Sequence, residues 1–259
     1  MKKIILTWVV LTMFILSSCA NGNTTNSGGF SSTETVEYAS LNSDWPVYKN
    51  AEELVERAEL VFIGSVTGIS FKMLDSVTGL PPDEDTEIDE WDPRLCTIYD
   101  VNIVTVYKGE PSAQTQVRVK GGLRDYRIEE QLAALAQYNQ KYIPVMGEQF
   151  EIEIGETYLF ALRQFETGTP TIMNPDQTSY NISNPFAKST ISRREFYKSA
   201  EYYNKNTDEN GGPLISAKDV ISYFGEDKWD DFWSKWQEDN PDWETRLDKA
   251  AVEKALAKE

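Results

Sequence analysis

Five stretches rich in β-branched and aromatic residues, with one helical stretch after the third, constrain the fold of this chain most strongly. The strand-like stretches cover residues 60–71, 96–107, 116–120, 156–164 and a weaker one at 169–173 or later, up to 182. Residues 128–138 have apolar side chains at helical spacing. Gly64 and Gly68 interrupt the first strand, which is typical of strands that bend sharply in a barrel. Three strands, a helix and two strands is the order of the five-stranded Greek-key barrel called the OB-fold.

Three segments of this region resemble the netrin-like branch of the OB barrels, which includes the tissue inhibitors of metalloproteinases and many bacterial lipoproteins. They are AEELVERAELVFIGSVTGIS (51–70), TIYDVNIVTVYKG (97–109) and GETYLFALRQ (155–164). The resemblance covers about residues 50–182. It implies an α+β fold with a five-stranded OB-like Greek-key β-barrel and an intervening helix. An untidier α+β sheet or a β-sandwich remains an alternative.

The inhibitory mechanism of that family does not carry over. In the metalloproteinase inhibitors, a free N-terminal cysteine held by disulfides chelates the zinc of the target enzyme. Here the N-terminal cysteine is predicted to be acylated, and the chain has only two cysteines, so no intramolecular disulfide is expected.

The N-terminus predicts lipid anchoring at Cys19. Lys2 and Lys3 precede an apolar run, 4–16, which is shorter than the roughly 20 residues a membrane span needs. Leu16-Ser17-Ser18-Cys19 then resembles the lipobox of bacterial lipoproteins, in which the cysteine receives a diacylglycerol. We therefore expect a signal peptide at 1–18 and an anchored protein on the extracytoplasmic face of a bacterial membrane. An ordinary cleaved signal with a free thiol is the alternative.

Three regions are expected after the signal peptide. Residues 19–44, rich in Ser, Thr, Asn and Gly, predict a flexible tether. Residues 45–190 are expected to form the OB-like barrel domain, with a helix beginning after Asn50. Residues 191–259 predict a helical C-terminal region, in which Ser192 with Glu195 and Ser216 with Asp219 have the spacing of capping boxes.

An aromatic stripe lies in the C-terminal region: Trp229, Phe232, Trp233 and Trp236. Its residues fall on one face of a helix, while the far side is uniformly polar. We expect these rings to pack into the protein core. The alternative is an exposed platform that stacks sugar rings or receives a partner helix.

Charge and composition exclude several functions. The formal net charge is −17, which argues against a nucleic-acid partner. The chain contains no histidine, so it lacks the commonest general base and the commonest transition-metal ligand. Cys96 opens a strand-like run and is expected to be a small buried residue rather than a reactive thiol.

These observations favour a non-catalytic protein that binds a peptide, a protein or a small molecule on one barrel face. Tyr99, Tyr126 and Arg127, with the loop that begins at Gly121, are the predicted binding residues. Two alternatives stay open: a cell-surface hydrolase that acts on glycans through paired carboxylates, and a structural envelope lipoprotein.

No cofactor is expected apart from the lipid on Cys19, with calcium as a minority hypothesis. Asn206, Asp208, Asn210 and Asp219 resemble the oxygen ligands of an EF-hand loop. The loop is two residues too long, and an Asn/Gly/Pro-rich linker is the alternative. The acidic stretch 83–92 has no glycine for the required turn and is expected to be a solvated loop.

Overall fold

The computed structural model describes residues 36–41, 46–76, 78–81, 92–138, 140–146, 152–164, 168–174, 177–187, 215–248, 252 and 256. The chain divides into two units, Met1–Thr35 and Val36–Glu259, and every described residue belongs to the second. The predicted signal peptide and the lipidation site at Cys19 therefore lie outside the described residues. Among the described helices, none has both the length and the apolar character that crossing a bilayer requires.

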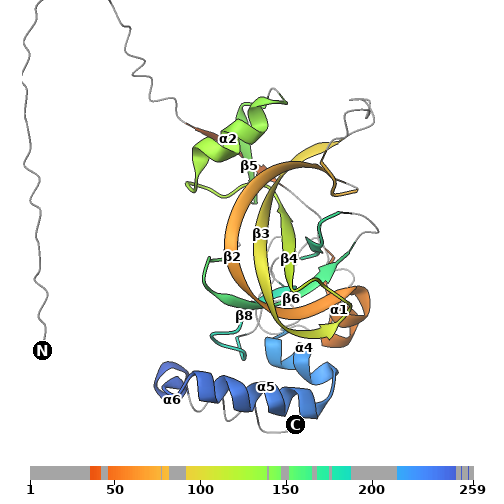
Figure 1. Cartoon of the computed structure of the whole chain (residues 1–259), viewed down its shortest axis with the longest axis vertical. Helices are drawn as coiled ribbons and strands as arrows, with labels where there is room; N and C mark the ends of the chain where they lie inside the picture. The colour runs from red at the N-terminus through yellow and green to blue at the C-terminus, as the bar shows by residue number, and fades with distance from the viewer. Residues whose placement is uncertain are drawn as a thin grey trace, which may run out of the picture. The chain divides into compact units, whose positions relative to one another are not determined.

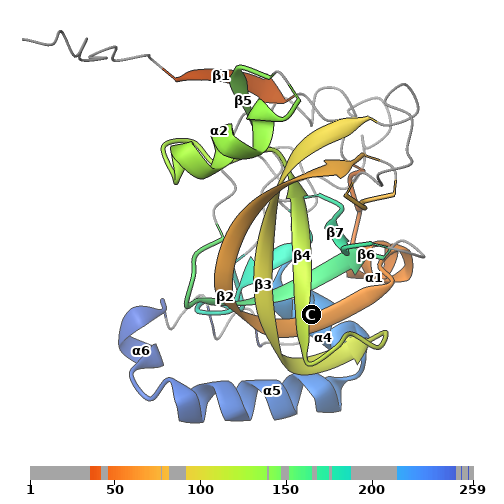
Figure 2. The ribbon, with the colours of Figure 1, turned by 45° about the horizontal axis from the view of Figure 1, so that its top comes forward.

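The main sheet is a ring of five strands. Figures 1 and 2 show how its long strands curve around the ring. In chain order the strands are β2 (Leu60–Asp75), β3 (Pro93–Lys108), β4 (Gln114–Lys120), β6 (Thr157–Arg163) and β7 (Thr171–Ile172). The order around the ring is β2-β3-β4-β7-β6, and β6 pairs with β2 to close it. A short strand, β8 (Ser179–Asn181), adds to β6. The predicted α+β class and the predicted order of strands and helix are confirmed.

The ring is not a clean barrel, because one side is joined through a very short strand. β7 pairs with β4 at Arg118 and Thr171, and with β6 at two residue pairs. A backbone bond from Arg118 N to Pro170 O, at 2.8 Å, adds to this join. By contrast, β2 and β3 pair from end to end. The join between β4 and β6 is therefore the weakest-paired part of the ring.

The long strand β2 bends where the glycine pattern predicted. Its pairing with β3 shifts register between Ile63 and Gly64 and again between Val66 and Gly68. A Cβ on Gly64 would lie 2.4 Å from Cγ1 of Val101 in β3, so only glycine permits this close approach. The bends let one strand pair with β3 on one edge and β6 on the other.

Alternating residues of these strands fill the inside of the ring. The strands have period-2 alternation, so one set of side chains points inward and forms a single apolar cluster. Its buried members are Leu60, Phe62, Val66, Ile69, Tyr99, Val101, Val117, Val119, Ile152, Tyr158, Phe160, Leu162 and Ile172. Phe160 lies between Phe62 and Tyr158, with ring centroids 5.6 and 5.8 Å away.

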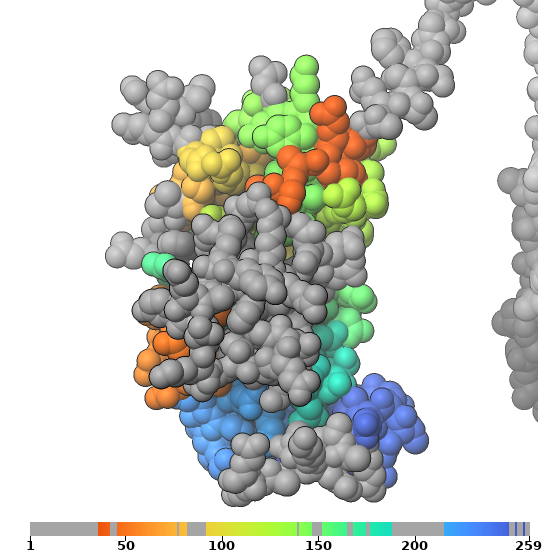
Figure 3. Space-filling model, turned by 180° about the vertical axis from the view of Figure 1, so that it is seen from behind, coloured from red at the N-terminus to blue at the C-terminus, as the bar shows by residue number. Residues whose placement is uncertain are grey.

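One end of the ring carries helix α2 (Ile128–Ala136) and a two-stranded parallel sheet of β1 (Glu37–Leu41) and β5 (Tyr142–Met146). Figure 3 shows β1, in red-orange, against the green surface of this region. Neither strand was predicted, and β1 corrects part of the expected tether at 19–44. In the sequence EYASL, Tyr38, Ala39 and Leu41 are half-buried, and the strand gains a partner only when distant β5 is beside it.

The opposite end of the ring carries helices α4 (Ala217–Tyr223), α5 (Glu226–Asp239) and α6 (Trp243–Arg246), with α1 (Ala51–Arg57) beside β6 (Figure 2). Asn50 caps α1 by accepting a hydrogen bond from Glu53 N at 2.9 Å. Ser216 and Asp219 form a capping box at α4. Both predicted helix starts are confirmed, whereas the start predicted at Ser192 lies outside the described residues.

The three tryptophans of the aromatic stripe of α5 are buried, as predicted, and Phe232 is half-buried. Trp229, Trp233 and Trp236 join an apolar cluster that includes Val61 and Ile63 of β2. Trp236 Nε1 donates a hydrogen bond to Ile182 O at 2.7 Å, which fixes α5 to the segment after β8. These rings are core residues and not an exposed platform.

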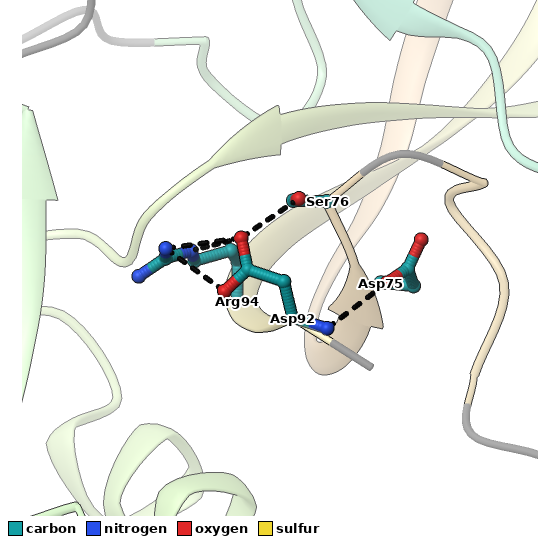
Figure 4. A network of polar contacts seen from close by, with 4 residues as sticks. All are labelled: Asp75, Ser76, Asp92 and Arg94. Atoms are coloured by element: carbon teal, nitrogen blue, oxygen red, sulfur yellow. Dashed lines mark hydrogen bonds and ion pairs between the residues drawn. The ribbon is translucent and has the colours of Figure 1, made fainter. Parts of the chain in front are cut away.

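A polar network joins the C-terminal end of β2 to the N-terminal end of β3 (Figure 4). The carboxylate of Asp75 accepts hydrogen bonds from Thr78 N and from Asp92 N. The carboxylate of Asp92 in turn accepts from Ser76 Oγ and pairs with Arg94 at 2.8 Å. Asp92, which ends the acidic stretch, therefore organises a turn.

Candidate functional site

A pocket of about 410 Å³ opens at the mouth of the ring. Figure 1 shows the elements at this end, where β4 ends beneath α2. Its base is formed by members of the interior cluster, including Ile69, Tyr99 and Val119. Apolar side chains dominate the wall. The full lining is Ile69, Thr97, Tyr99, Val119, Lys120, Gly121, Gly122, Leu123, Arg124, Asp125, Tyr126, Met146, Ile152, Glu153 and Ile154.

The segment from Gly121 to Tyr126 forms one wall, and a buried glutamine of α2 holds it in place. The side-chain amide of Gln131 accepts a hydrogen bond from Leu123 N at 3.0 Å and donates one to Leu123 O at 2.8 Å. It also donates to Tyr126 O. Thr97 Oγ1 donates to Gly121 O at 2.7 Å, so the wall is attached to β3 as well.

Two of the three predicted binding residues line the pocket. Tyr99 lies at its base and is fully buried, and half-buried Tyr126 lies in the wall. Arg127 is not part of the lining. Its Nη1 donates to Ile69 O at 3.1 Å and lies 3.6 Å from the Glu130 carboxylate, so it supports the wall from outside.

Sequence reasoning missed the part of the pocket that follows β5. Met146, Ile152, Glu153 and Ile154 belong to the lining. β5 itself was not predicted because Pro144 interrupts a short run, and proline demotes a strand prediction. No sequence signal connects these residues with Tyr99, since the ring brings them together through long-range pairing.

Tyr38 of β1 fixes two charged residues of the pocket rim. Its hydroxyl donates to Asp125 Oδ1 at 3.0 Å and accepts from Asp125 N at 3.1 Å. The Arg124 guanidinium lies 4.5 Å above the Tyr38 ring, which is a cation–π distance. The unpredicted strand β1 therefore positions the rim of the pocket.

Cys96 lies beneath the surface near this region and is an inert thiol. It is 2% exposed, and burial raises its pKa to about 11. A thiolate is the reactive form of cysteine, so this thiol is unreactive at neutral pH. The prediction of a buried strand residue is confirmed.

The described residues do not support the calcium hypothesis. Asn206, Asp208 and Asn210 lie outside them. The carboxylate of Asp219 accepts hydrogen bonds from Ser216 N at 2.8 Å and Ser216 Oγ at 2.7 Å, as the cap of α4. Within the described part of the chain, no three His, Cys, Asp or Glu residues group as metal ligands.

A second, wider groove of about 990 Å³ lies between α5 and the strands β2 and β3. Val104 and Val106 are exposed along it. Charged side chains of α5 border it, and Lys235 pairs with Asp239 at 3.4 Å. The groove is more polar and more open than the pocket at the mouth of the ring.

No protein-family model matches this chain, and the search of curated proteins finds no match. The fold defines an α+β protein with a five-strand ring, an intervening helix and C-terminal helices.

Proposed function

We propose that this chain is a lipid-anchored extracytoplasmic binding protein, that its ring is an OB-like Greek-key barrel, and that the pocket at the mouth of the ring holds its ligand. The apolar pocket containing Tyr99 and Tyr126 is the observation that carries this proposal. Ligand sites are typically concave, mostly apolar and furnished with a few polar groups, and barrel mouths are a common location. The volume of the pocket falls in the range of such sites.

The hydrogen bonds around the pocket support a preorganised binding site. The wall is held by Gln131 and the rim by Tyr38, so the lining is ordered by contacts within the protein. A preorganised site loses less conformational entropy when its ligand binds. The lipobox residues Leu16 to Cys19 support the anchored location.

A pocket-filling variant tests the proposed site. Leu123 is half-buried in the wall, and Leu123→Trp would place an indole in the cavity. We expect ligands that stabilise the parent chain in a thermal-shift screen of peptides, small molecules and cell-wall sugars to lose their effect on this variant. Leu80→Trp is the matched control, because Leu80 is exposed and lies outside the lining. Turnover of a glycan would instead favour the hydrolase, and a screen without any binder would favour the structural role.

Anchoring has its own test. Metabolic labelling with a radiolabelled fatty acid should mark the parent chain and not Cys19→Ala. Equal membrane retention of the two chains would refute lipid anchoring without affecting the pocket.

A further inference from the structure

The charges of the pocket lining divide into two groups. Arg124 and Asp125 are engaged by Tyr38. Lys120 and Glu153 also line the pocket, and within the described residues neither side chain makes an ion pair or a hydrogen bond. Among the described residues, one cation and one anion of the lining therefore stand ready to meet a ligand beside an apolar cavity.

The pocket lining has no net charge, unlike the chain as a whole. The chain carries a net charge of −17, whereas the lining holds two cationic and two anionic residues. A ligand with only an anionic group could pair with Lys120 alone, and one with only a cationic group could pair with Glu153 alone. Either ligand would leave one charge of the lining without a partner, whereas a ligand with both charges would complement both.

We infer that the pocket binds a short apolar peptide with both termini free, with its ammonium at Glu153, its carboxylate at Lys120 and its side chains among the apolar residues of the lining. This inference rests on the proposed function of the same pocket. It assigns roles to two residues that the sequence did not single out. Charge-assisted hydrogen bonds are the stronger class, so each terminus should contribute substantially to affinity.

Three dipeptide probes test this assignment on the purified full chain by calorimetry. Leucyl-leucine carries both termini, N-acetyl-leucyl-leucine lacks the ammonium, and leucyl-leucinamide lacks the carboxylate. We expect leucyl-leucine to bind about tenfold more tightly than either blocked probe, which corresponds to about 1.4 kcal/mol for each terminus.

Two charge-neutralising variants assign each terminus to its residue. Lys120→Gln should abolish the preference for leucyl-leucine over the amide and keep the preference over the acetyl probe. Glu153→Gln should do the reverse. Lys141→Gln and Glu110→Gln are the matched controls, because both residues are exposed outside the lining and should leave all affinities unchanged.

Other outcomes overturn the inference in distinguishable ways. Tighter binding of dodecanoate than of leucyl-leucine, lost in Leu123→Trp, would refute the peptide and leave the proposed pocket intact. Unaltered preferences in both variants would refute the roles of Lys120 and Glu153. Failure of all three dipeptides to bind would also refute the inference, while the broader screen with Leu123→Trp decides the proposed function separately.

Discussion

The side-chain amide of Gln131 pairs with both backbone polar groups of Leu123, in the way a neighbouring strand would. Gln177 does the same for Tyr48: its amide oxygen accepts from Tyr48 N at 2.8 Å and its nitrogen donates to Tyr48 O at 3.0 Å. Both glutamines are fully buried. A segment that belongs to no ladder can thus satisfy its backbone inside the protein through one side chain.

Replacing Gln131 should loosen the pocket wall. Gln131→Leu leaves the N–H and C=O groups of Leu123 without this partner, so we expect the free energy of unfolding to fall by about 2–3 kcal/mol. Denaturant unfolding measures this loss, and hydrogen exchange should show faster exchange at the Leu123 amide. Gln137→Leu, at an exposed position after α2, should change stability by less than about 0.5 kcal/mol. Equal stability of the two variants would contradict the role of Gln131.

A side chain at position 122 should clash with Gln131 and destabilise the fold. A Cβ at this position would lie 1.9 Å from Oε1 of Gln131, so Gly122→Ala must displace the amide that holds the wall. We expect a loss of about 1–3 kcal/mol in denaturant unfolding. Gly155→Ala provides the comparison, because no atom of the described residues beyond its chain neighbours lies within 4 Å of the added Cβ, and its positive φ of 94° is the source of strain. A smaller loss for Gly122→Ala than for Gly155→Ala would be inconsistent with this packing.

Loss of the indole nitrogen of Trp236 should destabilise the protein more than loss of the indole nitrogen of Trp243. Trp236→Phe removes the hydrogen bond to Ile182 O from a buried ring, and we expect about 1–3 kcal/mol of destabilisation. Trp243 is half-buried and contacts Trp233 edge-on at 5.3 Å. Trp243→Phe should therefore cost less in the same unfolding measurement. The reverse order would show that Trp236 does not fix α5 to the ring.

Stability should fall at alkaline pH because buried acids resist ionisation in the folded state. Burial raises the pKa of Cys96 from 9.0 to about 11, and burial likewise raises the pKa of Tyr107 from 10.0 to about 12. Between pH 9 and 11 the unfolded chain releases the thiol proton that the folded chain retains, so rising pH favours unfolding. The contribution of Cys96 is complete below about pH 9 and is lost by about pH 11.

The size of this effect can be checked with Cys96→Ala. Denaturant unfolding of the parent chain should lose about 1 kcal/mol per pH unit over this window on account of the thiol. Cys96→Ala should lose that part of the slope and keep the part due to the tyrosines. Parallel pH profiles for the two chains would refute the raised pKa of Cys96.

The parts of the fold that the sequence predicted are those encoded by local pattern. β2 and β3 are long runs rich in β-branched and aromatic residues, and the apolar spacing of α2 is visible in its nine residues. β1 and β5 are short and pair across about a hundred residues, so neither carries enough local signal. The same limit applies to the pocket: Tyr99 and Tyr126 were singled out, whereas Ile152 and Glu153 reach it only through the closed ring.

The brevity of β7 gives the ring a preferred line of opening. Two residues, Thr171 and Ile172, form the boundary between β4 and β6, whereas every other boundary of the ring is a longer ladder. Thermal fluctuations that part the strands will separate this boundary first, because fewest hydrogen bonds must break there. The protein thus has a built-in direction of expansion, along the boundary between β4 and β6, that leaves the β2–β3 ladder untouched.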